Sequence, residues 1–182
     1  VKNTYFLKNN ERIIINDTVI LPEGSGLLLN KGSQIEFKNR AGLVVRGGFT
    51  VKGTLRDQVY LKGSVDNRWS GVLILGNGSD VSINYLNVVG GNGIINGYRN
   101  RGAFTINKAN VSIQNSSFSQ NMSEDALNLV QAQGTLDKVV IKNTKSDALD
   151  IDYGKIEILN SQFFNIGSST GADAIDVSKS IV

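Results

Sequence analysis

A repeat of about 22 residues most restricts how this 182-residue chain can fold. Three stretches share an acidic residue, an alanine and then alternating apolar positions: "SEDALNLV" from Ser123, "SDALDID" from Ser146 and "GADAIDVS" from Gly171. The alanines Ala103, Ala126, Ala148 and Ala174 follow one another at intervals of roughly 22 to 26 residues, and "SGVLIL" places Gly71 one longer interval before Ala103. A drifting period of this length is typical of constant strands joined by turns of variable length.

Short strand-like units fill the first third of the chain. They read "TVILPEG", "GLLLNKG", "QIEFKN", "GLVVRGG", "FTVKG" and "VYLKGS", each a few β-forming residues closed by Gly or Asn. Three such units make one full turn of a solenoid with this period. No stretch sustains helical spacing over the length that a helix needs, and 20 glycines with one proline favour strands and tight turns. The sequence predicts one all-β domain of about seven or eight coils.

Alternation along the strand that contains the alanine predicts which side chains face the core. Two sets are apolar in every copy and should face inward: Val72, Phe104, Leu127, Leu149 and Ile175, and Ile74, Ile106, Leu129, Ile151 and Val177. Their neighbours should then face solvent in three columns: Gly71, Ala103, Ala126, Ala148 and Ala174; Leu73, Thr105, Asn128, Asp150 and Asp176; and Leu75, Asn107, Val130, Asp152 and Ser178.

The sequence resembles right-handed parallel β-helix proteins of the pectate-lyase-like superfamily. The resemblance lies in the length of the coil, the stacked aliphatic residues, the Asn after the second strand and the stretch "VILPEGSGLLLNKGSQIEF…LVVRGGFTVKGT…RWSGVLIL". The words "RWSG", "SEDALN", "SDALD" and "ADAID" are similar to bacterial secreted or cell-surface β-helix modules. The resemblance covers nearly the whole chain. It implies a single-stranded right-handed parallel β-helix, a β-solenoid, over residues 1–182. Because "DAIDVSKSIV" stops partway through a coil, we expect the native chain to continue beyond Val182.

Enzymes of this superfamily hold substrate along the exposed face of one strand stack, where acidic residues act as calcium ligands or acid/base groups. By position, Asp150, Asp152 and Asp176 correspond to such a face, with Asn128 and Thr105 beside them as substrate-binding residues. The sequence departs from the enzymes because it contains no His and lacks the paired Asp plus His and the Arg-Lys patterns of the hydrolases. No Arg lies in the exposed columns, where a lyase would place its base.

The behaviour of the stacked carboxylates Asp150 and Asp176 depends on whether they are sheltered or open to solvent. Asp150 and Asp176 on adjacent coils should lie about 4.8 Å apart, so two ionised carboxylates would repel. A sheltered groove would raise a pKa or recruit a cation, and oxygen ligands from Asp150, Asp176, Asp152 and Asn128 would suit Ca²⁺. An open face would leave ordinary surface carboxylates. No cofactor is required in either case.

Other residues have structural interpretations beside functional ones. Asp125, Asp147 and Asp173 precede the strand and should cap its turn by bonding backbone N–H groups two residues on. Asn115, Asp137 and Asn160 should bond along the stack of turns, and Trp69 should be buried. The insertion between Val89 and Gly102 carries Tyr98, Arg99 and Arg101, which either line a sugar subsite or shield the solenoid.

Composition excludes further classes. The net charge is +3, but residues 123–182 carry nine acidic and five basic residues, so the repeat end is acidic. The basic residues are scattered among Asn and Gly, which is atypical of a nucleic-acid binder. There is no apolar run of membrane-spanning length and no cysteine.

Two function classes remain from the sequence. The first is a non-catalytic β-helix module of a bacterial secreted, periplasmic or cell-surface protein that binds a polysaccharide or other glycan, or serves as a scaffold fused to or packed against further domains. The second is a polysaccharide lyase, epimerase or glycoside hydrolase that uses Asp150, Asp152 and Asp176. A cleft with a basic group over the carboxylates would favour the enzyme, and an open flat face would favour the module.

Overall fold

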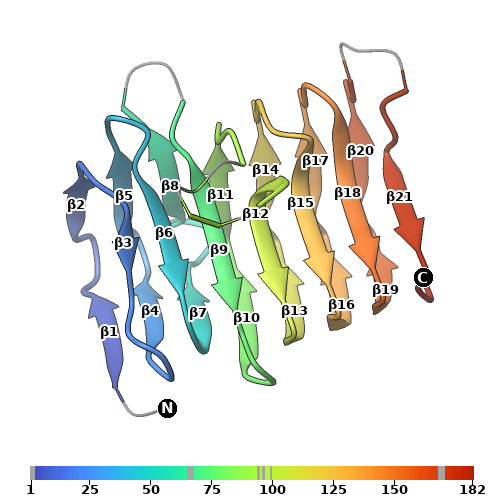
Figure 1. The fold of residues 1–182 in the computed structure, drawn as a ribbon. Coiled ribbons are helices and arrows are strands. Elements are labelled where there is room, and N and C mark those ends of the chain that lie inside the picture. Colours follow the sequence, from blue (N-terminus) through green and yellow to red (C-terminus); the bar gives the residue numbers. More distant parts are fainter. Residues whose placement is uncertain (1–2, 65–67, 94, 96, 99, 168–170) are drawn as a thin grey trace.

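The computed structural model describes residues 3–64, 68–93, 95, 97–98, 100–167 and 171–182. These residues form 21 short strands and no helix. The strands stack into a parallel β-solenoid of about seven turns, in which the chain climbs from β1 at one end to β21 at the other (Figure 1). The prediction of an all-β solenoid with about 22 residues per coil is confirmed, because Leu127 pairs with Leu149 and Leu149 with Ile175 in successive coils.

Three parallel sheets of seven strands form the walls. Sheet A contains β1 (Thr4–Leu7), β4 (Gly26–Asn30), β7 (Phe49–Lys52), β10 (Asp80–Asn84), β13 (Asn110–Gln114), β16 (Gln133–Asp137) and β19 (Lys155–Leu159). Sheet B contains β2 (Arg12–Ile15), β5 (Gln34–Phe37), β8 (Val59–Gly63), β11 (Leu86–Val89), β14 (Ser117–Ser119), β17 (Val140–Lys142) and β20 (Gln162–Phe164). Sheet C contains β3 (Val19–Ile20), β6 (Gly42–Val45), β9 (Gly71–Leu75), β12 (Gly102–Asn107), β15 (Asp125–Val130), β18 (Asp147–Asp152) and β21 (Ile175–Ser178).

The turn from sheet A to sheet B explains the recurring asparagines. In four successive coils it places one residue at positive φ, a conformation that Asn tolerates well: Tyr85, Asn115, Lys138 and Asn160. The Asn115 amide donates to Asn84 Oδ1 at 2.9 Å, and the Asn160 amide donates to Asp137 Oδ1 at 2.8 Å. Bonding along the stack is therefore confirmed. Asp137 itself is not equivalent to the two asparagines, because it pairs in register with Gln114, and Lys138 takes the position that Asn115 and Asn160 hold in their coils.

The core fills the space between the three sheets. The two predicted inward sets pair in register along sheet C and belong to one continuous apolar cluster, apart from Ile175 and Val177 in the last strand, which are partly exposed. Phe104 packs edge-on against Phe49 and Phe118, which joins all three sheets. Trp69 is buried as predicted and stacks on Phe37 with ring centroids 4.3 Å apart.

The predicted exposure of the alanine column is wrong. Ala103, Ala126 and Ala148 are buried, and the last two pack into the main core beside Leu127 and Leu149. Strict alternation fails in β15 and β18, where Ala126 and Leu127, and likewise Ala148 and Leu149, belong to the same buried cluster although they are consecutive in the sequence. Ala174, in the last coil, is exposed.

Part of the outer face of sheet C is covered, which the alternation pattern did not predict. Val44 and Leu73 pack under Ile95 from the insertion between β11 and β12, and Tyr98 packs against the same cluster. Shielding is therefore the observed role of Tyr98, and Arg99 lies outside the described residues. The described part of the chain contains no helix with the length and apolar character to cross a bilayer.

Candidate functional site

A single column of side chains on the outer face of sheet C changes from apolar to acidic along the solenoid. In register, successive coils contribute Val44, Leu73, Thr105, Asn128, Asp150 and Asp176. The parallel pairing thus brings together the predicted site residues Asn128, Asp150 and Asp176. Asp152 lies two positions further along the strand, next to Ser178 of the following coil and Val130 of the preceding one.

Burial divides this column, contrary to the prediction that all of it faces solvent. Thr105, Asn128 and Asp150 are only 5%, 3% and 5% exposed, whereas Asp176 is exposed. The backbone at Gly102 lies against two of these side chains, since a Cβ added there would meet Asn128 Cβ at 2.8 Å and Thr105 Oγ1 at 2.9 Å. Thr105 and Asn128 therefore leave little surface for a ligand to contact.

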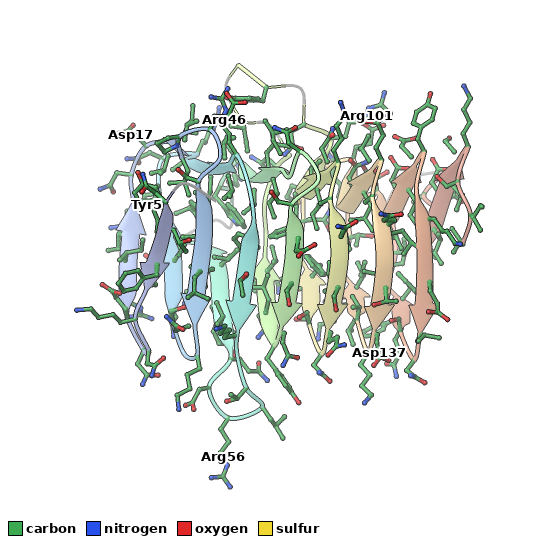
Figure 2. The ribbon with its side chains drawn as sticks, turned by 90° about the horizontal axis from the view of Figure 1, so that it is seen from below. Tyr5, Asp17, Arg46, Arg56, Arg101 and Asp137 are labelled. Carbon is green, nitrogen blue, oxygen red and sulfur yellow. The ribbon has the colours of Figure 1, made fainter. Side chains whose placement is uncertain are left out.

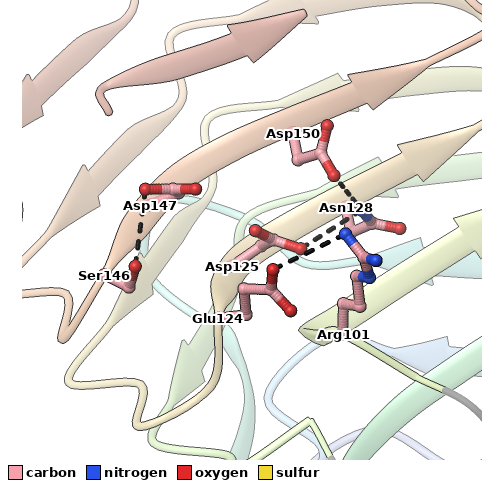
Figure 3. Close-up of polar contacts among 7 residues, drawn as sticks. All are labelled: Arg101, Glu124, Asp125, Asn128, Ser146, Asp147 and Asp150. Carbon is pink, nitrogen blue, oxygen red and sulfur yellow. Dashed lines mark hydrogen bonds and ion pairs between the residues drawn. The ribbon is translucent and has the colours of Figure 1, made fainter. Parts of the chain in front are cut away.

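The amide of Asn128 connects two carboxyl groups. Its Nδ2 donates to Asp125 Oδ2 at 3.2 Å and to Asp150 Oδ2 at 2.7 Å (Figure 3). Both acceptors are buried, with Asp125 only 2% exposed. Hydrogen bonds to charged acceptors inside a protein hold side chains in fixed positions, so the three residues form a rigid unit, here called the carboxyl network.

The two carboxyl groups of the network are weaker acids than an ordinary aspartate. Burial raises the pKa of Asp125 to about 7, with added repulsion from Asp150, Glu124 and Asp147, while the Asn128 hydrogen bond opposes the rise. Burial also raises the pKa of Asp150 to about 6, with repulsion from Asp152 and Asp176. Both groups therefore hold a proton to higher pH than an ordinary aspartate does.

Arg101 is the basic group whose charge acts on the network. Its positive charge opposes the rise in the pKa of Asp150. Its Nη1 lies 3.5 Å from Glu124 Oε1. Both side chains of this ion pair are more than half exposed, so the pair itself contributes little stability. Figure 3 shows Glu124 beside Asp125 and Arg101 beside Asn128, with the ion pair joining them.

Asp147 does not cap its own turn as predicted. Its Oδ1 accepts a hydrogen bond from the backbone N–H of Asp173 at 2.8 Å, in the next coil. Ser146 also donates to Asp147, at 3.4 Å. Asp125 likewise departs from the local cap, because its carboxylate contacts the Asn128 side chain. These aspartates therefore join coils or side chains to one another.

A polar hollow of about 440 Å³ lies at the edge where β12, β15 and β18 begin. Its walls include Asn92, Arg101, Met122, Glu124, Lys145 and Ser146. Of the predicted insertion residues that the structure describes, Arg101 lines it, whereas Tyr98 packs elsewhere. A planar guanidinium, an ammonium, a carboxylate and an amide offer both donors and acceptors for hydroxyl groups.

Asp125 and Glu124 were missed as candidate site residues. Strict alternation places Asp125 on the same face as Leu127, yet its carboxylate contacts Asn128 on the opposite face. The spacing of Asp125 and Asn128 in "SEDALN" could have indicated this contact. It did not, because strict alternation assigns the two side chains to opposite faces of the strand.

The described residues contain no group of three or more carboxylates or histidines placed to hold a metal ion. The predicted calcium site at Asp150 and Asp176 remains a prediction. A scan of protein-family models, a search of curated proteins and a search of solved structures each find no match to this chain.

Proposed function

We propose that this chain is a non-catalytic β-solenoid module of a bacterial secreted, periplasmic or cell-surface protein, and that it binds a glycan. The observation that carries the proposal is the polar hollow beside Arg101, whose walls combine Arg101, Lys145, Glu124 and Asn92. Sugar hydroxyls both donate and accept hydrogen bonds, so a mixed wall of this kind suits them. Asp125 of the carboxyl network directly follows Glu124 of the wall in the chain, so the network holds the start of β15 at the edge of the hollow.

Glycan binding can be tested at Arg101 with a matched control. Affinity electrophoresis in gels containing soluble neutral or acidic polysaccharides should retard the wild type, and Arg101→Ala should weaken the retardation at least fivefold. Arg56→Ala is the control, because Arg56 projects from the turn between β7 and β8, far from Arg101 (Figure 2). Equal retardation of wild type and Arg101→Ala would exclude the hollow as the binding site.

A second candidate function, a polysaccharide lyase, epimerase or glycoside hydrolase, is favoured by one observation. Asp125 and Asp150 have pKa values raised to about 7 and about 6 and share the Asn128 donor. A carboxyl group that is protonated near neutral pH can act as a general acid, while an ionised neighbour acts as base or nucleophile. Asp152 and Asp176 would complete the acidic face.

The two candidate functions are distinguished by product formation. An enzyme should release reducing ends or unsaturated sugars from some polysaccharide in the panel, and Asp150→Asn should abolish the release. A module should bind without any product after prolonged incubation. Calcium should raise the melting temperature of the wild type, and not that of the variant Asp150→Asn with Asp176→Asn, if those two carboxylates bind the ion.

A further inference from the structure

A second hollow lies on the outer face of sheet A, a different wall of the solenoid from the carboxyl network. Its volume is about 650 Å³, within the range of ligand pockets. Four successive strands, β10, β13, β16 and β19, contribute to it. Strands in a sheet lie about 4.8 Å apart, so the hollow extends about 14 Å along the solenoid. Its shape suits a ligand that is longer than it is wide.

The floor of this hollow is formed by small side chains. Ser82 and Ser112, which pair in register in adjacent coils, both line it. Gly134, in register with Val111 and Ile156, also lines the hollow. Within the described residues, neither the Ser82 nor the Ser112 hydroxyl has a hydrogen-bond partner, so both remain able to donate and accept.

One rim of the hollow is already ordered. The Asn110 amide donates to Asp80 Oδ1 at 3.1 Å, and the Gln133 amide donates to Asn110 Oδ1 at 2.8 Å. Lys155 continues the same row in the next coil. Because these side chains are held by one another, a ligand would remove less side-chain entropy on binding than it would at a row of free side chains.

The lining indicates the chemistry of the ligand. No aromatic residue is among the described residues that line the hollow, and its valines, Val81 and Val111, are buried. A protein partner would need apolar or aromatic anchors of the kind that dominate interfaces. Strand addition is also excluded on a sheet face, because the backbone groups already pair with the neighbouring strands.

The charges of the lining residues narrow the class of ligand further. The lining carries two carboxylates, Asp80 and Glu157, and one ammonium, Lys155. An anionic polymer would meet a net repulsion, whereas free hydroxyls and side-chain amides suit an uncharged ligand with many hydroxyl groups. We propose that the hollow on sheet A binds an extended, uncharged polysaccharide, lying across β10, β13, β16 and β19, independently of the hollow beside Arg101.

The test is affinity electrophoresis of the full chain in gels containing dextran, galactomannan or mixed-linkage β-glucan, with polygalacturonate as the anionic comparison. At least one neutral polymer should retard the wild type. Ser112→Phe, which fills the floor, should weaken that retardation at least fivefold. Gln133→Ala, which removes one rim amide and adds no bulk, should weaken it by a smaller factor and keeps the test valid if the larger substitution disturbs folding.

Two controls separate this site from other surfaces. Ser178→Phe places the same ring on β21, the exposed last strand of sheet C, and should leave the retardation unchanged. Ser112→Phe should weaken the retardation by a similar factor in the Arg101→Ala background, which distinguishes this inference from the proposed function. The inference is overturned if no neutral polymer retards the wild type, if only polygalacturonate does, or if Ser112→Phe leaves the retardation of the Arg101→Ala protein unchanged.

Discussion

Asp125 and Asp150 show how a single amide can hold two buried acids in place. Both carboxyl groups accept from Asn128, and Arg101, which partly offsets the charge of Asp150, is itself paired with Glu124. The sequence predicted the register of Asn128 with Asp150, because strand pairing follows from the repeat. It did not predict the burial of Asn128, because the backbone at Gly102, which lies against this side chain, belongs to the preceding coil.

The stability of the protein should fall as the pH rises through the pKa of Asp125. Its folded-state pKa of about 7 lies above the unfolded value of 3.8, so the folded state binds the proton more tightly. This contribution is complete below the unfolded value and is lost as the pH rises through the folded one. Its upper limit is about 4 kcal/mol for a shift of about three units.

Replacing Asp125 by Asn isolates the effect of its raised pKa on stability. Asp125→Asn should unfold at a higher denaturant concentration than the wild type at pH 8, and the advantage should shrink or reverse at pH 4. Chemical denaturation at both values measures it. Glu23→Gln, at an exposed carboxylate, is the control and should show no such change. An Asp125→Asn advantage that is the same at both pH values would contradict the assigned pKa.

Gly134 is required for a backbone reason that the repeat alone does not reveal. Its φ is +143°, and an added Cβ would lie 1.8 Å from the carbonyl oxygen of Val111 in the preceding coil. We expect Gly134→Ala to lower the free energy of unfolding by about 2 kcal/mol or more, as strain and a clash with backbone combine. Gly78→Ala, at φ +86° with open space around the site, should cost less in the same denaturation experiment. Equal losses would show that the contact with Val111 is unimportant.

At the scale of elements, the repeat predicted the strands and their inward faces because each coil repeats the same apolar positions. Leu127, Leu149 and their counterparts stack as expected. The predicted exposure of the alanine column was wrong for a local reason, since in β15 and β18 the alanine and the leucine after it both belong to the core cluster. The insertion between β11 and β12 could not be placed from sequence, because it has no counterpart in the other coils. Its position depends on Ile95 packing over Val44 and Leu73.

Ile95 should anchor the insertion to sheet C. It is 1% exposed and packs on Val44 and Leu73. Ile95→Ala should destabilise the protein by about 2 kcal/mol, since it removes buried apolar surface. Limited proteolysis should then cleave near Arg101 faster, while circular dichroism still reports an intact β-structure. Leu55→Ala, at a side chain that is 72% exposed, should change neither measurement. An unchanged cleavage rate in Ile95→Ala would mean that the insertion is held by other contacts.

At the scale of the whole molecule, the solenoid contacts are made almost entirely between neighbouring coils. Each strand pairs with the strand one coil before and one coil after, so the stability of the chain is a sum over coils and the interfaces between them. Strands at the two ends of the stack have one neighbour each and carry exposed apolar residues, such as Phe6 in β1 and Val177 in β21. The middle coils have two neighbours and should be the last to open.

Hydrogen exchange should show this gradient and the part that Phe104 plays in it. Backbone amides of β9, β12 and β15 should exchange most slowly, and those of β1 and β21 fastest. Phe104 is fully buried and contacts Phe49 and Phe118, so Phe104→Ala should cost about 4 kcal/mol and accelerate exchange in the neighbouring coils as well as its own. Val177→Ala, at a side chain 42% exposed in the last strand, should affect β21 and leave the middle coils unchanged. If Phe104→Ala accelerates exchange in β12 alone, the coils do not share stability through their interfaces, and the additive description of the solenoid fails.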